Sequence, residues 1–168
     1  MILAFDSYYF DNKAKTVCVA FEDWCSDKPY KIYNETIEHT EDYQSGEFYK
    51  RELPCIISLL NKIDIQPIDL IIVDGFVYLD DDGKFGLGGY LYQSLQQKIP
   101  VIGVAKNNFA TIVHSKQALL RGESMKPLYI TAIGMDVQEA TQKIKSMHGE
   151  FRIPTLLKML DGHTKEKL

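Results

Sequence analysis

The chain has 168 residues, of which 45% are hydrophobic and 25% charged, and its net charge is −4. These values are ordinary for a globular protein and favour a single domain over residues 1–168. No apolar run is long enough to cross a membrane, and the N-terminal sequence lacks the basic leader of a signal peptide. The three cysteines, Cys18, Cys25 and Cys55, lack C-x-x-C spacing, which argues against a disulfide framework and a zinc site and favours the reducing cytoplasm.

The first forty residues predict three antiparallel strands. Residues 1–9 begin with an apolar run, and residues 15–24 and 30–39 alternate apolar and polar side chains and are rich in β-formers. The links between these segments are short and turn-like, so each strand is expected to pair with the next one.

Helices and strands alternate after this meander. The strands expected over 68–75, 100–108 and 126–135 are almost continuously apolar, which indicates parallel pairing with both faces covered. Helices are expected over 45–63, 86–98, 136–147 and 152–160, followed by a frayed tail. The sequence therefore predicts an α/β fold, a mixed sheet of three antiparallel strands followed by parallel strands and flanked by helices.

Three residues refine the helix predictions. Ser45 and Asp136 are expected to cap the N-termini of their helices. Pro54 falls inside the helix over 45–63, where it predicts a kink or a break.

Two of the expected strands end in an aspartate, Asp6 and Asp74. If these strands are parallel neighbours, the two carboxylates lie about 5 Å apart at the edge of the sheet where ligands collect. Carboxylates so close repel each other unless a cation joins them, and oxygen ligands favour Mg²⁺ or Mn²⁺. An aspartate followed by glycine is also a common turn residue, so an ordinary structural role stays open for both.

Two further charged residues are expected near this edge. Glu52, on the helix before the strand over 68–75, offers a third oxygen ligand. Lys106 follows the apolar run of the next strand, where it would hold a phosphate or stabilise developing negative charge. The alternative for Lys106 is a surface lysine whose stem covers apolar residues. A metal held by such carboxylates activates water for displacement at phosphorus, so the pattern favours a phosphodiesterase.

Several segments, in order over nearly the whole chain, resemble the endonuclease V family, nucleases of the ribonuclease-H-like fold. They are "ILAFDSYY", "DYQSGEFYKREL", "DLIIVDG", "FGLGGYL", "IPVIGVAKNNF" and "RIPTLLKML". The resemblance implies a ribonuclease-H-like sheet. It also implies cleavage of DNA or RNA at the second phosphodiester 3′ of inosine, with Mg²⁺ or Mn²⁺.

The resemblance implies roles for individual residues. Three acids become the metal-binding and catalytic residues: Asp6, Glu52 and Asp74. Lys106 becomes the phosphate-side base or electrostatic stabiliser. Tyr43 matches the tyrosine of the family's wedge, which replaces the stacking lost when the lesion base is extruded, although an ordinary surface or core role stays open. Gly75 belongs to the loop expected to contact the nucleic acid.

The chain also departs from the family's pattern. The wedge "DYQS" lacks two prolines of the family's motif. Val77 and the acids Asp80–Asp82 stand where the family has a His-Pro pair and its surroundings. Met135 stands where a histidine is expected near the active site. No helix precedes the first strand.

We therefore expect a divergent, N-terminally short family member, an endonuclease acting on deaminated nucleic acid. The alternative is a weakened or inactive module, on the same fold, that binds nucleic acid or protein. A monomer is favoured, and the sequence leaves open the oligomeric state and the choice between DNA and RNA.

Overall fold

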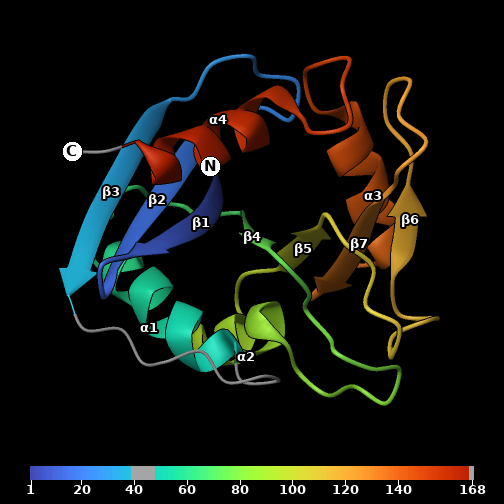
Figure 1. Cartoon of the computed structure of the whole chain (residues 1–168), viewed down its shortest axis with the longest axis horizontal. Coiled ribbons are helices and arrows are strands. Elements are labelled where there is room, and N and C mark those ends of the chain that lie inside the picture. The colour runs from blue at the N-terminus through green and yellow to red at the C-terminus, as the bar shows by residue number, and fades with distance from the viewer. Residues whose placement is uncertain (39–47, 167–168) are drawn as a thin grey trace.

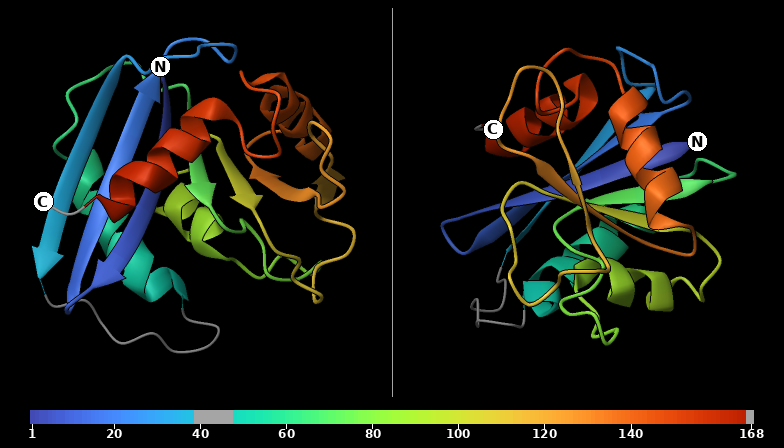
Figure 2. Two further views of the ribbon diagram at one scale, coloured as in Figure 1. Left: turned by 45° about the horizontal axis from the view of Figure 1, so that its top comes forward. Right: turned by 90° about the vertical axis from the view of Figure 1, so that its right-hand side faces the viewer.

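The computed structural model describes residues 1–38 and 48–166 (Figure 1). The strands of this part are β1 (Ile2–Phe10), β2 (Lys13–Phe21), β3 (Lys31–Glu38), β4 (Leu70–Asp74), β5 (Val101–Ala105), β6 (Gln117–Leu119) and β7 (Leu128–Ile133). The helices are α1 (Phe48–Leu60), α2 (Leu87–Ser94), α3 (Val137–Ser146) and α4 (Thr155–Lys165). The strands form a sheet in the order β3-β2-β1-β4-β5-β7-β6, with α1 and α2 on one face and α3 and α4 on the other (Figures 1 and 2).

The predicted antiparallel meander is present. β1 pairs with β2 along its whole length, and β2 pairs with β3. Asp11 and Asn12 connect β1 to β2 with φ angles of 47° and 59°, the left-handed values that a two-residue hairpin turn requires and that Asp and Asn tolerate.

The later strands pair partly as expected. β4 lies parallel to both β1 and β5. β7, by contrast, runs antiparallel to β5, and β6, which the sequence did not predict, runs antiparallel to β7. Residues 106–127, between β5 and β7, contain no helix that would carry the chain back for a parallel crossover, so the chain returns in the opposite direction.

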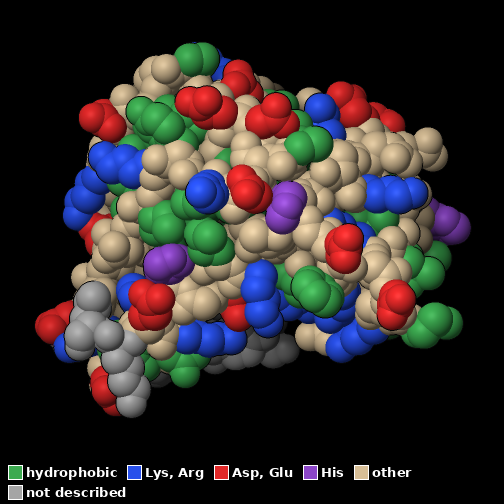
Figure 3. Space-filling model, turned by 90° about the horizontal axis from the view of Figure 1, so that it is seen from above, with side chains coloured by type: hydrophobic (Ala, Val, Ile, Leu, Met, Phe, Trp, Pro, Cys, Tyr) green, Lys and Arg blue, Asp and Glu red, His purple; other side chains and the backbone are tan. Residues whose placement is uncertain are grey.

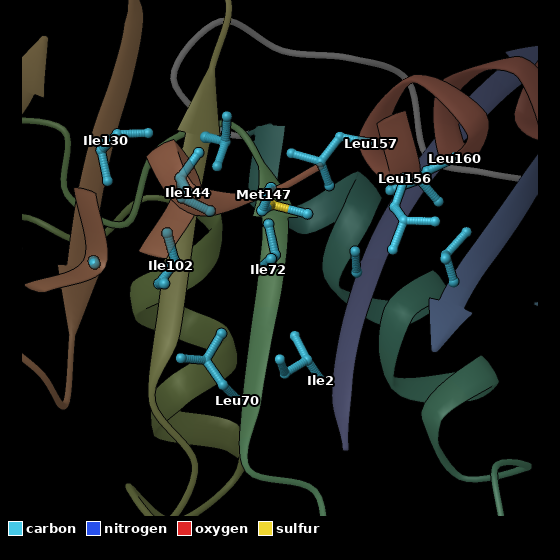
Figure 4. Close-up of a cluster of buried hydrophobic side chains, with 14 of the residues drawn as sticks. Ile2, Leu70, Ile72, Ile102, Ile130, Ile144, Met147, Leu156, Leu157 and Leu160 are labelled. Atoms are coloured by element: carbon cyan, nitrogen blue, oxygen red, sulfur yellow. The ribbon is translucent and has the colours of Figure 1, made fainter. Parts of the chain in front are cut away.

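The core consists of one apolar layer on each face of the sheet. Ile2 and Ala4 of β1 pack in the layer beneath α3 and α4, and the alternating Leu3 and Phe5 pack in the layer beneath α1 and α2. Figure 4 shows strand isoleucines, Ile72 among them, meeting the side chains of α3 and α4 in the first layer. Each such buried aliphatic side chain stabilises the fold by about 1.5–3 kcal/mol.

The helices differ from expectation in two ways. α1 is continuous through Pro54, so the helix does not break there, and a kink, the other expected outcome, stays a prediction. α4 continues to Lys165, so most of the segment expected to fray is helical. Asp136 caps α3 as predicted, because its carboxylate accepts from the Glu139 amide at 3.2 Å, whereas Ser45 lies outside the described residues. None of the helices in the described part of the chain has the length and apolar character required to span a bilayer.

Candidate active site

Two aspartates lie side by side where the parallel pairing of β1 and β4 ends. Asp74 is the last residue of β4, whereas β1 continues past Asp6 to Phe10, so the expectation that the first strand ends at Asp6 is wrong. Parallel pairing of these strands ends at Phe5↔Val73. The next residues, Asp6 and Asp74, are therefore neighbours at the sheet edge. Because side chains alternate along a strand, both carboxylates point to the face that α4 covers. Both line a pocket between this edge and α4, together with Lys106 and apolar side chains of α4.

The closeness of the two aspartates changes their acidity. Burial and the charge of Asp74 raise the pKa of Asp6 to about 7, although the Ser7 amide donates to the Asp6 carboxylate at 2.8 Å. Burial also raises the pKa of Asp74, against the opposing effect of Lys106. Because the two carboxylates carry like charges at one site, the ionisation of one opposes the ionisation of the other.

Glu52 approaches the same strand end from the opposite face of the sheet. It lies on α1, is only 5% exposed and is close to the hydroxyls of Tyr9 and Ser7. Burial and the charge of Asp6 raise the pKa of Glu52 to about 8, which the two hydroxyls only partly offset. Glu52 is therefore coupled electrostatically to the aspartates, but it does not line their pocket. Within residues 1–38 and 48–166, no three His, Cys, Asp or Glu side chains are grouped closely enough to hold a metal ion.

An acid on α4 holds the lysine that follows β5. The Lys106 Nζ lies 3.7 Å from an oxygen of Asp161, whose other oxygen accepts from Lys165 at 3.1 Å. Burial opposes the ionisation of Asp161, but Lys165 and Lys106 outweigh it and keep the pKa of Asp161 below its usual value. After burial, the charge of Asp161 is a further cause that raises the pKa of Asp6 and Asp74.

Asp161 was not among the expected site residues, because it falls in the segment expected to fray. The available signal was the helical spacing of Leu157, Leu160 and Thr164, which are buried on one side of α4. Asp161 follows Leu157 by one turn, so it lies at the margin of that stripe and faces the sheet edge.

Two arginines fix the backbone around Lys106. Arg152 donates to the carbonyl of Lys106 and, at 2.9 Å, to that of Pro127. Arg121 is buried and donates to four carbonyls between residues 147 and 152. The pair ties the segment before α4 to the end of β5.

A family model of endonuclease V matches residues 1–161. The chain belongs to the endonuclease V family. Similar solved structures include endonuclease V from Streptomyces avermitilis (TM-score 0.75, 19% identity, covering 98% of this chain and 79% of that one). Another is Ciona intestinalis endonuclease V (TM-score 0.80, 16% identity, covering 98% and 83%), bound to a 23mer DNA containing an inosine followed by a ribo-adenosine. No curated protein is significantly similar to the chain in sequence.

The predicted ribonuclease-H-like fold and the family assignment are both confirmed. Marinitoga piezophila Argonaute shares this fold with a TM-score of 0.56 and 9% identity, over 99% of this chain and 30% of that one. Endonuclease V proteins are nucleases, and this member presents its acids at the carboxyl edge of a parallel strand pair.

Two of the departures from the endonuclease V pattern lie away from the pocket. β7 runs antiparallel to β5, with Ile133 beside Val101, so Met135 follows β7 at the sheet edge opposite Asp74 and packs on the core. The expectation that Met135 stands near the active site is therefore wrong. Val77 is fully buried and its amide donates to Thr131 Oγ1 at 2.9 Å, so it too belongs to the core.

The acidic loop has a structural role. The Asp81 carboxylate accepts from the amides of Val113, His114 and Ser115 at 2.8–3.1 Å, and these bonds lower the pKa of Asp81. Asp80 accepts from two amides of its own turn, at residues 82 and 84. None of the three acids of this loop lines the pocket. The loop therefore joins the connection after β4 to the connection after β5.

Of the two residues predicted to contact nucleic acid, only Gly75 lies in the described part of the chain. Tyr43 lies outside the described residues. Gly75 has a φ of +123°, and its amide donates to Val104 at 3.0 Å, so it turns the chain back onto β5 directly after Asp74. Gly103 allows this approach, because a Cβ there would lie 2.5 Å from the Gly75 carbonyl oxygen. A contact between Gly75 and nucleic acid stays a prediction.

Proposed function

We propose that the chain is a metal-dependent endonuclease that cleaves DNA or RNA on the 3′ side of deaminated bases such as inosine. The observation that carries this proposal is the meeting of Asp6 and Asp74 beside Lys106 at the carboxyl edge of β1 and β4. Membership of a nuclease family supports the reaction. The inosine-containing DNA bound by the Ciona relative supports the substrate.

The donor set fits Mg²⁺ or Mn²⁺. It consists of carboxylate oxygens, without thiolate or imidazole, and its two nearest members repel each other in a way that a divalent cation would relieve. Asp6 and Asp74 would hold the ion, and Glu52 and Asp161 are the nearest further carboxylates. When bound, such an ion polarises the scissile phosphate and activates water.

The residues around the acids would orient the substrate. Lys106, held at 3.7 Å by Asp161, would stabilise the negative charge that develops on the phosphate. Arg152 fixes the main chain from which the Lys106 side chain extends. Glu52, with a pKa of about 8, keeps a proton on its carboxyl group at neutral pH until a cation approaches.

The decisive experiment is cleavage of labelled single-inosine oligonucleotides, both DNA and RNA, with Mg²⁺ and with Mn²⁺. We expect a cut at the second phosphodiester 3′ of inosine that Asp74→Asn abolishes. Asp27→Asn, which makes the same chemical change at an exposed position, should cut normally. Absence of cleavage by the folded, metal-bound wild-type chain would refute the proposal.

A second candidate is a module that binds deaminated nucleic acid without cutting it. It is favoured by the absence, among the described residues, of three acids grouped as a ready metal site. Retained binding of inosine-containing strands without cleavage in either metal would support this candidate.

The proposed place of action is the reducing cytoplasm. Cys18, Cys25 and Cys55 are free thiols, and two of them are buried. Structural disulfides are rare in that compartment, which agrees with this arrangement.

A further inference from the structure

Two aromatic side chains extend the row of residues that begins at Asp6. β1 continues past the end of its pairing with β4 and pairs there only with β2. In this part of β1, Tyr8 is 43% exposed and Phe10 is 37% exposed. Their rings lie nearly parallel, at 24°, with centroids 6.1 Å apart. Other aromatic side chains of the described residues are at least as exposed as Phe10, namely Tyr30, Phe109 and Phe151, but Tyr8 and Phe10 combine exposure with stacking on each other, which suggests a binding surface.

The pair lies on the same face of the sheet as the Asp6 carboxylate. Alternate residues of a strand share a face, so Tyr8 and Phe10 lie about 7 Å and 13 Å beyond Asp6 along β1. α4 packs across β1 and β2 on this face (Figure 2). Figure 3 shows this face from above, with Lys and Arg side chains interrupted by acidic ones along its lower margin.

Cations flank the aromatic pair. Lys13 and Lys15 of β2 lie directly opposite Phe10 and Tyr8. Lys15 is buried and donates to the Glu166 carbonyl at 3.1 Å. The Lys13 side chain is 41% exposed and lies 3.8 Å from the exposed carboxylate of Glu38. Lys165, at the end of α4, donates to Asp161 at 3.1 Å, and the charges of Asp161, Asp6 and Tyr8 together raise the pKa of Lys165.

This combination suits the bases and phosphates of an unpaired strand. Proteins that bind single-stranded nucleic acid stack bases on exposed aromatic rings and neutralise phosphates with neighbouring cations. Bases inside a duplex are already stacked on their neighbours, and their faces are not available to a ring on the protein surface. The pair also lies in the same row of side chains along β1 as Asp6, one of the acids proposed to cut the strand.

We propose that Tyr8 and Phe10 form a stacking platform for unpaired bases of the substrate strand next to the cut, so that the protein prefers single-stranded or locally opened nucleic acid. The inference rests on the proposed function for the position of the cut. The stacking itself requires no catalysis and is therefore tested by binding.

The experiment measures the affinity of the full chain for a labelled inosine oligonucleotide, single-stranded or fully paired, in an Asp74→Asn background that prevents cutting. Tyr8→Thr and Phe10→Thr keep strand-forming residues. Each should weaken single-strand binding about 5- to 100-fold, the range expected for one lost base stack, and duplex binding much less. Tyr30→Thr is the matched control, because Tyr30 is 60% exposed and lies at the other end of the hairpin strands. Tyr8→Trp, which keeps an aromatic ring at this position, should bind the single strand about as tightly as the chain with Tyr8.

A second measurement reports on stacking in the wild-type chain. A fluorescent 2-aminopurine, placed in turn on each side of inosine, should be quenched at one position when the strand binds, and Tyr8→Trp should preserve this quenching. The proposal is overturned if Tyr8→Thr and Phe10→Thr match Tyr30→Thr, if they weaken single-strand and duplex binding equally, or if no position is quenched. If Tyr8→Thr fails to fold, Phe10→Thr and the quenching decide.

The two proposals fail differently. Aromatic-dependent binding without cleavage by the wild-type chain would keep the platform and remove the nuclease. Inosine cleavage with single-strand affinity indifferent to Tyr8 and Phe10 would keep the nuclease and remove the platform.

Discussion

Replacing Glu52 with glutamine should stabilise the ion-free protein at pH 8. Glu52 is buried beside Asp6, and its pKa is raised from the usual 4.5 to about 8. A carboxyl group with such a pKa lowers the free energy of unfolding by about 5 kcal/mol once it is fully ionised. Part of this value is the repulsion that the charge of Asp6 exerts on Glu52, and a buried glutamine amide keeps a polar group at this position. We therefore expect Glu52→Gln to recover about 2–4 kcal/mol.

The effect has a defined pH window. Below about pH 4.5 the carboxyl group is protonated in both the folded and the unfolded chain, so wild type and Glu52→Gln should be equally stable. As the pH rises towards 8, the unfolded chain releases its proton first, and the wild type loses stability relative to the variant. The melting temperature of Glu52→Gln at pH 8 should exceed that of wild type by about 4–16 °C for a chain of this size.

Thermal unfolding followed by circular dichroism, with chelator present, measures this difference. Glu22→Gln is the control, because Glu22 is exposed and should change the melting temperature little. Mn²⁺ should stabilise wild type more than Glu52→Gln, since the ion removes the repulsion only where a charge exists. Equal melting temperatures at pH 8, or a less stable Glu52→Gln, would show that neighbouring groups already compensate the charge of Glu52 and that its pKa is not raised.

The remaining predictions concern the ion, the lysine and two loops. The affinity for Mn²⁺, measured by calorimetry, should strengthen as the pH rises from about 6 to about 9. Asp6 and Glu52, with pKa values of about 7 and about 8, must lose their protons to bind the ion. An affinity independent of pH would exclude these two acids as ligands. Asp161→Asn should lower kcat about tenfold or more with little change in KM, because Lys106 loses the carboxylate that holds it. Asp81→Ala should speed amide hydrogen exchange at residues 113–115 without changing cleavage. Gly103→Ala should lower the free energy of unfolding in urea by about 1–3 kcal/mol, because its Cβ would meet the carbonyl oxygen of the turn after β4 at 2.5 Å.

Local patterns were sufficient to predict the part of the site that lies on adjacent strands. The apolar runs before Asp6 and Asp74 marked where the parallel pairing of β1 with β4 ends, although β1 itself continues to Phe10. This pairing makes the two carboxylates neighbours. The short links between the first three strands likewise fixed their antiparallel pairing. In both cases the information lies within a few residues of the feature that it determines.

The sequence failed where direction and distance depend on the whole fold. The apolar run of β7 reads the same in either direction, and only the absence of a crossover helix after β5 makes it antiparallel. That one reversal moves Met135 from the expected active-site edge to the opposite edge. Asp161 was missed for a related reason. Its ion pair with Lys106 forms only because α4, at the C-terminal end of the chain, packs onto β1 and β2 at the N-terminal end.

These corrections bear directly on the choice between an enzyme and a binding module. The alternative was motivated in part by Met135 and the acidic loop, and neither of these lines the pocket. Val77 fills the core, and Asp81 holds a neighbouring loop through its amides. These departures from the family pattern therefore carry no argument against catalysis. What separates the two candidates is whether a cation draws Glu52 and the two strand-end aspartates together, and the pH dependence of Mn²⁺ affinity together with the Asp74→Asn cleavage assay tests that directly.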